Sequence, residues 1–217
     1  MAPARLGGRA RLAVTGLLLC LGCPRQRPPC SADLPSLIEL RGGNGGLELA
    51  LRAPPTARED GSLDLCDAGG ARVGRLSEGR TPRTVRLDNA AGDPMVRLSA
   101  APGEDPSFIR GGERPGRLHD EANLLRLLDP DGVPVGQVGV QGDRLVAFNG
   151  AGLPLATAET VEHRQVVRRP DGSVRYYAIG LATPRAAALL ALDRLPLAER
   201  LAVARFIDGG PPPSSSR

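Results

Sequence analysis

The chain has 217 residues with 28 basic and 24 acidic side chains, and all of its lysine-or-arginine positions are arginine. Because lysine is absent, a Walker A phosphate loop, a lysine Schiff base and a Ser-Lys dyad are excluded. The charges are interspersed and Phe and Tyr together number five, so no nucleic-acid partner is expected, since such binding needs a basic face with aromatic rings for stacking. Arginine without lysine is typical of a GC-rich bacterium.

The N-terminal segment has the pattern of an export signal. Arg5, Arg9 and Arg11 precede an apolar run from Leu12 to Leu21. This run has about ten residues, half of the roughly 20 that a helix needs to cross a bilayer. Residues 1–22 are therefore predicted to be a cleavable signal peptide.

The signal ends in Cys20-Leu21-Gly22-Cys23, which resembles the lipobox of bacterial lipoproteins. The resemblance implies cleavage before Cys23 and lipidation of its sulfur, with palmitate among the acyl chains, so that the lipid attaches the protein to a membrane of the cell envelope. Leucine is usual where Cys20 stands, and two alternatives stay open: cleavage without a lipid, or an uncleaved anchor. Pro24 is not the aspartate that retains lipoproteins at the inner membrane of enteric bacteria, so the outer membrane is favoured.

Two cysteines remain after the signal and the lipid-bearing residue are set aside. Residues 23–35 are rich in Pro, Arg and Ser and are predicted to be a tether that holds a domain off the membrane. In the oxidising periplasm Cys30 and Cys66 are expected to form a disulfide, with two unpaired thiols as the alternative. Cys66 should lie at the surface, because it follows Leu63 and Leu65 on the opposite face of an alternating segment.

Residues 36–208 are predicted to form a single β-rich domain of about eleven or twelve short antiparallel strands, arranged as a meander or barrel. Apolar and polar residues alternate in most of the domain, so each strand has one dry face and one wet face. The segments that carry this pattern are 47–51, 63–66, 85–88, 96–99, 124–128, 133–140, 145–148, 161–167 and 174–179.

Turn signals separate these segments. They are Asp60-Gly61, Asp67 to Gly70, Asn89 to Gly92, Asp129 to Gly132, Gly142-Asp143, Asn149 to Gly152 and Pro170 to Ser173. Glycine supplies the positive φ that tight hairpins require, and Asp or Asn closes the turn with its side chain. The glycine- and proline-rich segment 102–116 is expected to be a long surface loop.

The pattern becomes helical near the C-terminus. Thr183-Pro184 is an N-cap followed by a first-turn proline, and an apolar run continues to residue 192. Pro196 interrupts this helix or opens a second one over 197–207, whose apolar positions cover most of its circumference. We expect one or two C-terminal helices packed in or against the strands, because a helix that is apolar on most sides is surrounded by protein. Residues 209–217 are predicted to be a disordered tail.

Strand, Asp-x-x-Gly, strand hairpins closed by an apolar C-terminal helix resemble the tubby-like superfold, which also contains phospholipid scramblases and LURP-one-related proteins. The matching pieces are 65–74, 128–136 and the helix that ends at Ile207, within residues 36–208. The resemblance implies a twelve-stranded barrel around a central helix. Pro196 and the charges in the final helix depart from this pattern, and the superfold carries no shared catalytic set that could be transferred.

No catalytic, cofactor-binding or metal site is predicted. His119 is expected in a solvated loop with Asp120 and Glu121, and His163 on a strand; the HExxH and paired CxxC spacings of zinc sites are absent. Asp129 to Gly132 begins like a calcium loop but lacks the third acidic position and the distant Glu, so a hairpin turn explains it better.

Two further patterns have structural explanations. The Asp-Gly-Ser triplets at 60–62 and 171–173 lie in turns and are not nucleophile elbows. Tyr176 and Tyr177 must point to opposite faces of their strand, so one is expected in the core and only the other could serve a ligand.

Together these patterns predict a lipid-anchored bacterial envelope protein with a non-catalytic β-rich domain that binds or scaffolds a protein, lipid or glycan. The alternative is an envelope hydrolase or lipid-handling enzyme with a site assembled from distant acidic residues, because the carboxylates of glycosidases need no fixed spacing in sequence. The two differ in whether a concave pocket brings acidic side chains together.

Overall fold

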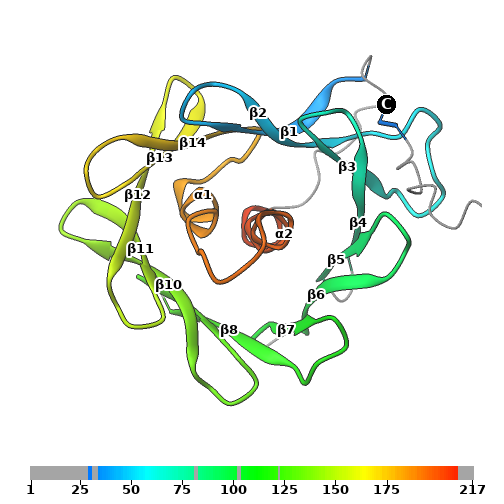
Figure 1. The fold of residues 1–217 in the computed structure, drawn as a ribbon. Coiled ribbons are helices and arrows are strands. Elements are labelled where there is room, and N and C mark those ends of the chain that lie inside the picture. Colours follow the sequence, from blue (N-terminus) through cyan, green and yellow to red (C-terminus); the bar gives the residue numbers. More distant parts are fainter. Residues whose placement is uncertain (1–28, 31–33, 81–82, 102–103, 122, 210–217) are drawn as a thin grey trace, which may run out of the picture.

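The strands close into one barrel around two helices (Figure 1). The structure is a computed structural model that describes residues 29–30, 34–80, 83–101, 104–121 and 123–209. The expected fold class, a mainly β antiparallel barrel with C-terminal helices, is confirmed, with fourteen strands where eleven or twelve were expected. The predicted signal peptide, the predicted lipidation site Cys23 and most of the predicted tail lie outside the described residues.

Each strand pairs antiparallel with its neighbours in the chain, and β14 pairs with β1 to close the barrel. The elements are β1 (Ser36–Gly42), β2 (Leu47–Arg52), β3 (Leu63–Asp67), β4 (Arg72–Arg80), β5 (Arg83–Asn89), β6 (Pro94–Ala100), β7 (Ser107–Arg110), β8 (Gly116–Glu121), β9 (Leu124–Leu128), β10 (Pro134–Gln141), β11 (Arg144–Asn149), β12 (Pro154–Val161), β13 (Arg164–Arg168), β14 (Val174–Ile179), α1 (Pro184–Leu189) and α2 (Leu197–Asp208).

Two of the expected segments differ from the structure, and in both cases the prediction missed a strand. Residues 102–116 are not one long loop, because β7 lies within them and β8 begins at Gly116. β7 has only four residues, too few for an alternating pattern to stand out, and it is held by pairing with β6, where the hydroxyls of Ser99 and Ser107 lie 2.6 Å apart. Segment 161–167 is split by a turn at Glu162 and His163 into β12 and β13.

One end of the barrel carries a turn that is repeated with almost the same geometry. Its first residue is an Asp or Asn whose side-chain oxygen accepts from the backbone N–H four residues later at 2.8–2.9 Å. The glycine at the fourth position has positive φ and donates to the carbonyl of the first residue at 3.0–3.1 Å. These first residues are Asp67, Asn89, Asp129 and Asn149, and we call this end of the barrel the Asx-turn end.

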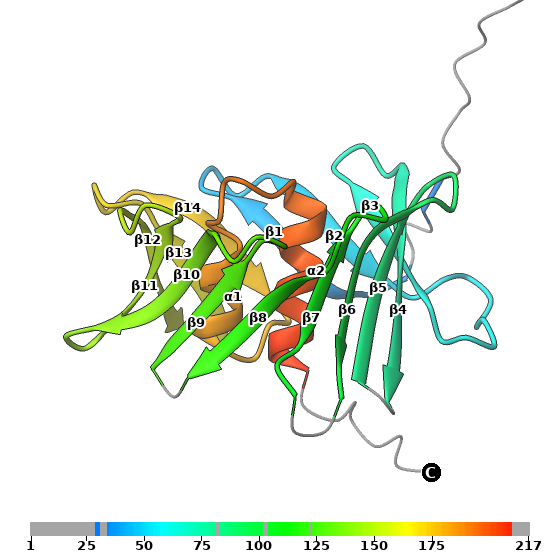
Figure 2. The same ribbon diagram turned by 90° about the horizontal axis from the view of Figure 1, so that it is seen from below.

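The predicted turn signals at these positions are therefore confirmed, and the local sequence accounts for them. Asp and Asn can satisfy backbone N–H groups with their own side chains, while glycine adopts positive φ at no steric cost. Seen from the side, these turns lie at one end of the barrel, and α2 ends at the opposite one (Figure 2). We call that opposite end the Asp208 end.

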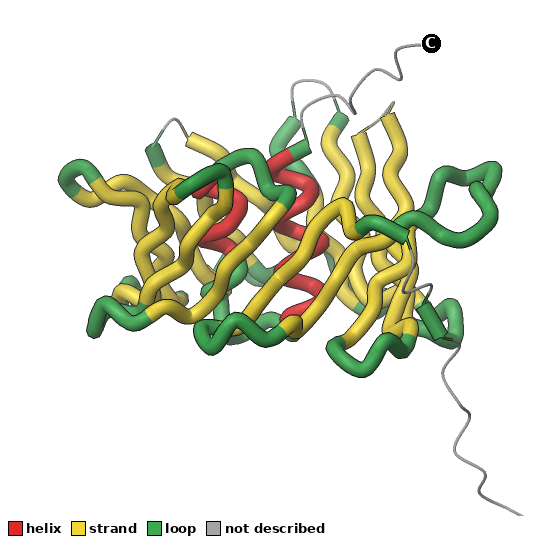
Figure 3. Tube along the Cα trace, turned by 90° about the horizontal axis from the view of Figure 1, so that it is seen from above, coloured by secondary structure: helices red, strands yellow, loops and turns green. Residues whose placement is uncertain are grey.

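The helices fill the interior of the barrel (Figure 3). A barrel of about eight strands is filled by side chains alone, so fourteen strands leave room for further elements. α1 and α2 run in opposite directions along the interior. In the common core, α1 buries Ala186 to Leu189, and α2 buries Leu201 to Ala204 and Phe206. Within the described residues, no helix is long and apolar enough to cross a membrane.

The wall differs on the two sides of the interior. Around α1, strands β11 and β12 present the small side chains of Ala147, Ala156 and Ala158, and a methyl group added at Gly136 on β10 would lie 2.5 Å from the side chain of Leu192. Around α2, strands β5 and β6 present leucine and valine. The alanine-rich α1 can thus approach its wall closely, while larger side chains fill the wider space around α2.

At the Asp208 end the two helices are tied by one carboxylate. Thr183 is the N-cap of α1, as predicted, and its hydroxyl accepts from the N–H of Ala186 at 3.2 Å. The carboxylate of Asp208 accepts from the N–H groups of Ala182 and Thr183, both at 2.9 Å. The free N–H groups before α1 are thereby satisfied by a negative charge, which the helix dipole favours.

At the Asx-turn end the connection between the helices is held by a buried arginine. Arg200 donates to the carbonyls of Leu195 at 2.6 Å, Leu190 at 3.0 Å and Asp193 at 3.4 Å. Burial lowers the pKa of Arg200, yet an arginine side chain stays charged in proteins. Next to it, Glu199 is buried and pairs with Arg110 at 2.7 Å. The charged side chains of Glu199 and Arg200 are thus compatible with a buried final helix, because each has a partner.

Candidate functional site

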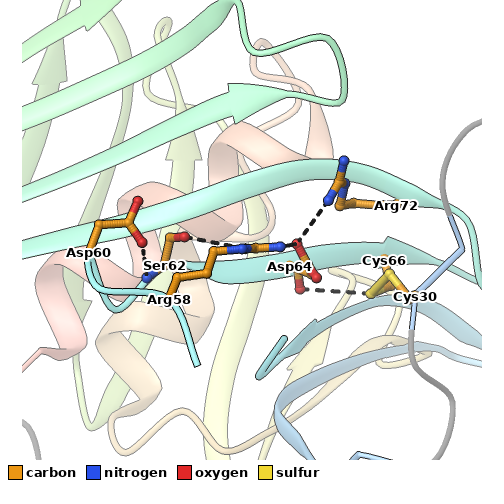
Figure 4. A network of polar contacts seen from close by, with 7 residues as sticks. All are labelled: Cys30, Arg58, Asp60, Ser62, Asp64, Cys66 and Arg72. Atoms are coloured by element: carbon orange, nitrogen blue, oxygen red, sulfur yellow. Dashed lines mark hydrogen bonds and ion pairs between the residues drawn. A yellow bond between two sulfur atoms is a disulfide. The ribbon is translucent and has the colours of Figure 1, made fainter. Parts of the chain in front are cut away.

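The N-terminal segment is attached to the outside of the barrel by a disulfide between Cys30 and Cys66 (Figure 4). The Cα atoms of the pair lie 6.1 Å apart. The N–H of Cys30 also donates to the carbonyl of Gly70 at 2.8 Å, and Pro29 forms a β-bridge with Ala71. Residues 29–30 therefore extend the sheet beside the turn that joins β3 and β4.

Cys66 lies on the outer face of β3, as the alternating pattern predicted, but it is not at the surface. Only 2% of the residue is exposed. The expected exposure was wrong because the alternating pattern distinguishes inner from outer faces, but it cannot show that residues 29–30 and the long connection between β2 and β3 cover this outer face. We call this covered outer face the anchor face, consisting of Cys30, Arg58, Asp60, Ser62, Asp64, Cys66 and Arg72.

A buried carboxylate lies beside the disulfide on the anchor face. The Nη2 atom of Arg58 lies 2.8 Å from Oδ1 of Asp64, and Nη1 of Arg72 lies 3.7 Å from the same oxygen (Figure 4). Asp64 is 4% exposed. A carboxylate that loses its water in this way must be paired, and here both partners come from neighbouring parts of the chain.

The connection between β2 and β3 is ordered by its own polar groups. Arg58 donates to the hydroxyl of Ser62 at 3.2 Å, and Oδ1 of Asp60 accepts from the N–H of Ser62 at 3.0 Å. This backbone hydrogen bond holds the pKa of the exposed Asp60 below its ordinary value. Ser62 thus has a structural role in a turn, as the sequence indicated.

Two hollows open at the Asx-turn end. The first has a volume of about 360 Å³ and is lined by Gly42, Gly43, Asn44, Glu48, Arg169, Val174, Arg175 and Tyr176. The second has about 310 Å³ and is lined by Arg72, Arg75 and the turn from Asp88 to Gly92. Each contains a single carboxylate and two guanidinium groups, so neither brings together the pair of carboxylates that a glycosidase uses.

The histidines occupy other positions than expected. His119 lies on β8, where its ring nitrogens contact Asp105 at 2.8 Å and Glu121 at 3.0 Å. The prediction of a loop failed because this end of β8 is polar, although it still pairs with β9. His163 is in the turn between β12 and β13 at φ 66°, not on a strand.

The two carboxylates raise the pKa of His119, mainly through the hydrogen bond with Asp105. His119 is part of a polar cluster on the Asp208 end, where Arg185 at the start of α1 also binds Asp120 at 2.5 Å. In the part of the chain that the structure describes, no group of three or more His, Cys, Asp or Glu side chains is arranged to hold a metal ion.

The remaining candidates have structural roles. Asp129 holds its hairpin turn by accepting from the N–H groups of Asp131 and Val133 at 2.9 and 2.8 Å. Tyr176 is 9% exposed and belongs to the core, while Tyr177 is half-buried on the outer face beneath Arg164. Ser173 donates to Asp171 in its turn at 2.7 Å. The polar network around Asp64 was missed, because nothing in the sequence brings Arg58 and Arg72 to the same carboxylate.

Comparison with known proteins does not assign the chain to a family. No protein-family model matches the chain, and no curated protein matches its sequence.

Proposed function

We propose that this chain is an exported bacterial envelope protein, anchored in a membrane by a lipid on Cys23, whose barrel is a non-catalytic binding or scaffolding domain. The charged segment with Arg5, Arg9 and Arg11, the short apolar run and the cysteine at its end support export and lipid attachment. Pro24 favours the outer membrane as the place where the protein resides.

The observation that carries this proposal is the disulfide between Cys30 and Cys66. Disulfides persist in oxidising compartments such as the bacterial periplasm and are rare in the cytosol. The bond also lies seven residues after Cys23, directly after the proposed anchor. A signal, a cysteine at its end and a disulfide in this order support the proposal of an envelope lipoprotein.

The interior of the barrel favours a binding or scaffolding role over the alternative of a hydrolase. α1 and α2 occupy the interior with apolar side chains, where an enclosed site would otherwise be. The two hollows at the Asx-turn end are lined by hairpin turns and strand ends and have one carboxylate each. A protein, lipid or glycan ligand would accordingly bind to the outer surface or the ends of the barrel.

The resemblance to the tubby-like superfold is also part of the proposal. A closed antiparallel barrel with an apolar C-terminal helix inside supports it. The count of fourteen strands and the additional short helix α1 depart from a twelve-stranded barrel around one helix. No binding residue is transferred from that superfold to this chain.

Lipid attachment can be tested by expressing the full chain in a bacterium supplied with labelled palmitate. We expect the label in the wild type and in Cys20→Ser, and none in Cys23→Ser, because only Cys23 would be the acceptor. Mass spectrometry of the mature wild-type protein should place its N-terminus at Cys23. Label retained in Cys23→Ser, or a mature N-terminus elsewhere, would contradict the proposal.

A further inference from the structure

The direction of β1 and the position of the disulfide point to opposite ends of the barrel. β1 begins at Ser36, and the carbonyl of Leu37 lies against Gly180, just before the N–H groups that bind Asp208. The chain therefore enters the barrel wall at the Asp208 end. A membrane anchor connected only through β1 would pull on that end.

The disulfide instead holds the preceding segment at the other end. Cys66 is the penultimate residue of β3, and the next residue, Asp67, opens one of the four Asx turns. Cys30 is bonded to Cys66 and donates to Gly70 within that turn. Chain leaving Cys30 toward the N-terminus therefore starts from the Asx-turn end.

The length of chain between Cys23 and Cys30 limits how the barrel can stand on a membrane. Seven residues span at most about 25 Å when fully extended. Without the disulfide the span would run to Ser36, thirteen residues and about 47 Å. β4 has nine residues, so with a tilt of about 40° the wall beside the disulfide is about 23 Å high. If the barrel stood with its Asp208 end on the membrane, the segment from Cys23 to Cys30 would have to run along the height of the wall. This would use almost the whole length of that segment.

We infer that the disulfide turns the Asx-turn end toward the lipid surface and presents the Asp208 end to the envelope space. The inference rests on the proposed lipid at Cys23, and the partner of the Asx-turn end is the bilayer that holds this lipid. Val133 and Leu153, which close two neighbouring Asx turns, are 51% and 62% exposed and would face that bilayer, whereas Leu37 and Val140, each 53% exposed near the Asp208 end, would not. The cluster of His119, Asp120 and Arg185 would face away from it.

The orientation can be measured with the full-length protein, purified from membranes with its anchor and reconstituted in vesicles that contain an acceptor-labelled phospholipid. A fluorescent amino acid would be introduced in one of two exposed turns, at Ala91 on the Asx-turn end or at Asp143 on the Asp208 end. We expect stronger energy transfer to the bilayer from position 91 than from position 143. Equal transfer, or stronger transfer from 143, would overturn the inference.

The double variant Cys30→Ser/Cys66→Ser tests whether the disulfide causes this orientation. Its linker becomes thirteen residues long and enters at the Asp208 end, so the difference between positions 91 and 143 should disappear or reverse. If the difference persists in a variant that still melts cooperatively, the disulfide does not set the orientation. Mass spectrometry of the same preparations separates the two proposals: protein without lipid contradicts the proposed anchor, whereas lipidated protein with equal transfer contradicts only the orientation.

Discussion

Both ends of the barrel contain helix ends with free backbone N–H groups and carbonyls, and the charged side chains near these groups are more deeply buried at one end than at the other. Because α1 and α2 are antiparallel, each end contains the start of one helix and the end of the other, with unsatisfied N–H groups and carbonyls respectively. At the Asx-turn end the buried Arg200 donates to carbonyls that follow α1, and the buried Glu199 lies in the first turn of α2, where it pairs with Arg110. At the Asp208 end the more accessible Asp208 and Arg83 bind backbone groups of the helix ends, Arg83 by donating to the carbonyl of Phe206.

The sign of each charge follows from the direction of the helix. The free energy that is lost when the charge is removed depends on how deeply it is buried. A cation belongs at the end of a helix and an anion at its start. Where the charged group is buried, no water can replace it, so its removal leaves unpaired polar groups. The Asx-turn end should therefore be the more sensitive of the two.

The largest effect is expected for Arg200→Met. The substitution leaves the carbonyls of the buried Leu190 and Leu195 without this donor, and it also removes the contact with the exposed Asp193. The free energy of unfolding should fall by roughly 3 to 5 kcal/mol, measured by denaturant titration. Arg194→Met, in the same connection but exposed, is the matched control and should change stability by less than about 0.5 kcal/mol. Equal losses would refute the special role of Arg200.

A smaller loss is expected for Asp208→Ala. Its carboxylate accepts from Ala182 and Thr183, but water can reach these groups and replace part of the interaction. We expect a loss of about 1 to 2 kcal/mol, comparable to the removal of a helix cap. Asp208→Asn keeps an acceptor and should lose less. If Asp208→Ala destabilises the protein as much as Arg200→Met, burial does not explain the difference between the ends.

Turns at the two ends also differ in which residues adopt positive φ. The Asx turns use glycine there, whereas the turn between β12 and β13 at the Asp208 end places Glu162 at φ 48° and His163 at φ 66°. His163→Gly should stabilise the barrel by about 0.5 to 1 kcal/mol, and Gly152→Ala should destabilise it by a similar amount. Thermal unfolding of both variants measures this, and effects of the same sign would contradict the assignment of backbone strain.

The smallest effect concerns pH at the Asp208 end. The pKa of His119 is raised above its usual value of about 6.5 by Asp105 and Glu121, so the folded state holds this proton more tightly than the unfolded chain. The associated stabilisation is fully present below about pH 6.5 and is lost as the pH rises through the raised pKa. An NMR titration should find a lower pKa for His119 in Asp105→Asn; an unchanged pKa would exclude Asp105 as the main cause.

Local patterns of the sequence were enough for the turns, most strands and the helices. The Asx turns depend on an Asp or Asn and a glycine three residues later, both of which can be read directly. Thr183 and Pro196 mark the starts of the two helices for equally local reasons. The pairing of Cys30 with Cys66 followed from counting cysteines, with unpaired thiols as the other possibility.

The sequence by itself thus determined the fold class, most strands and the turns, because alternation and turn chemistry act over a few residues, and its signal composition is the basis of the proposed route to the envelope. Only the tertiary structure decided that fourteen strands close around two helices, that Cys66 is covered, and that Asp64 lies between Arg58 and Arg72. These features depend on residues brought together by closure of the barrel and by a long connection folded over its outer face. A pattern read along the chain records which face a side chain takes, but what packs against that face is set by the other strands.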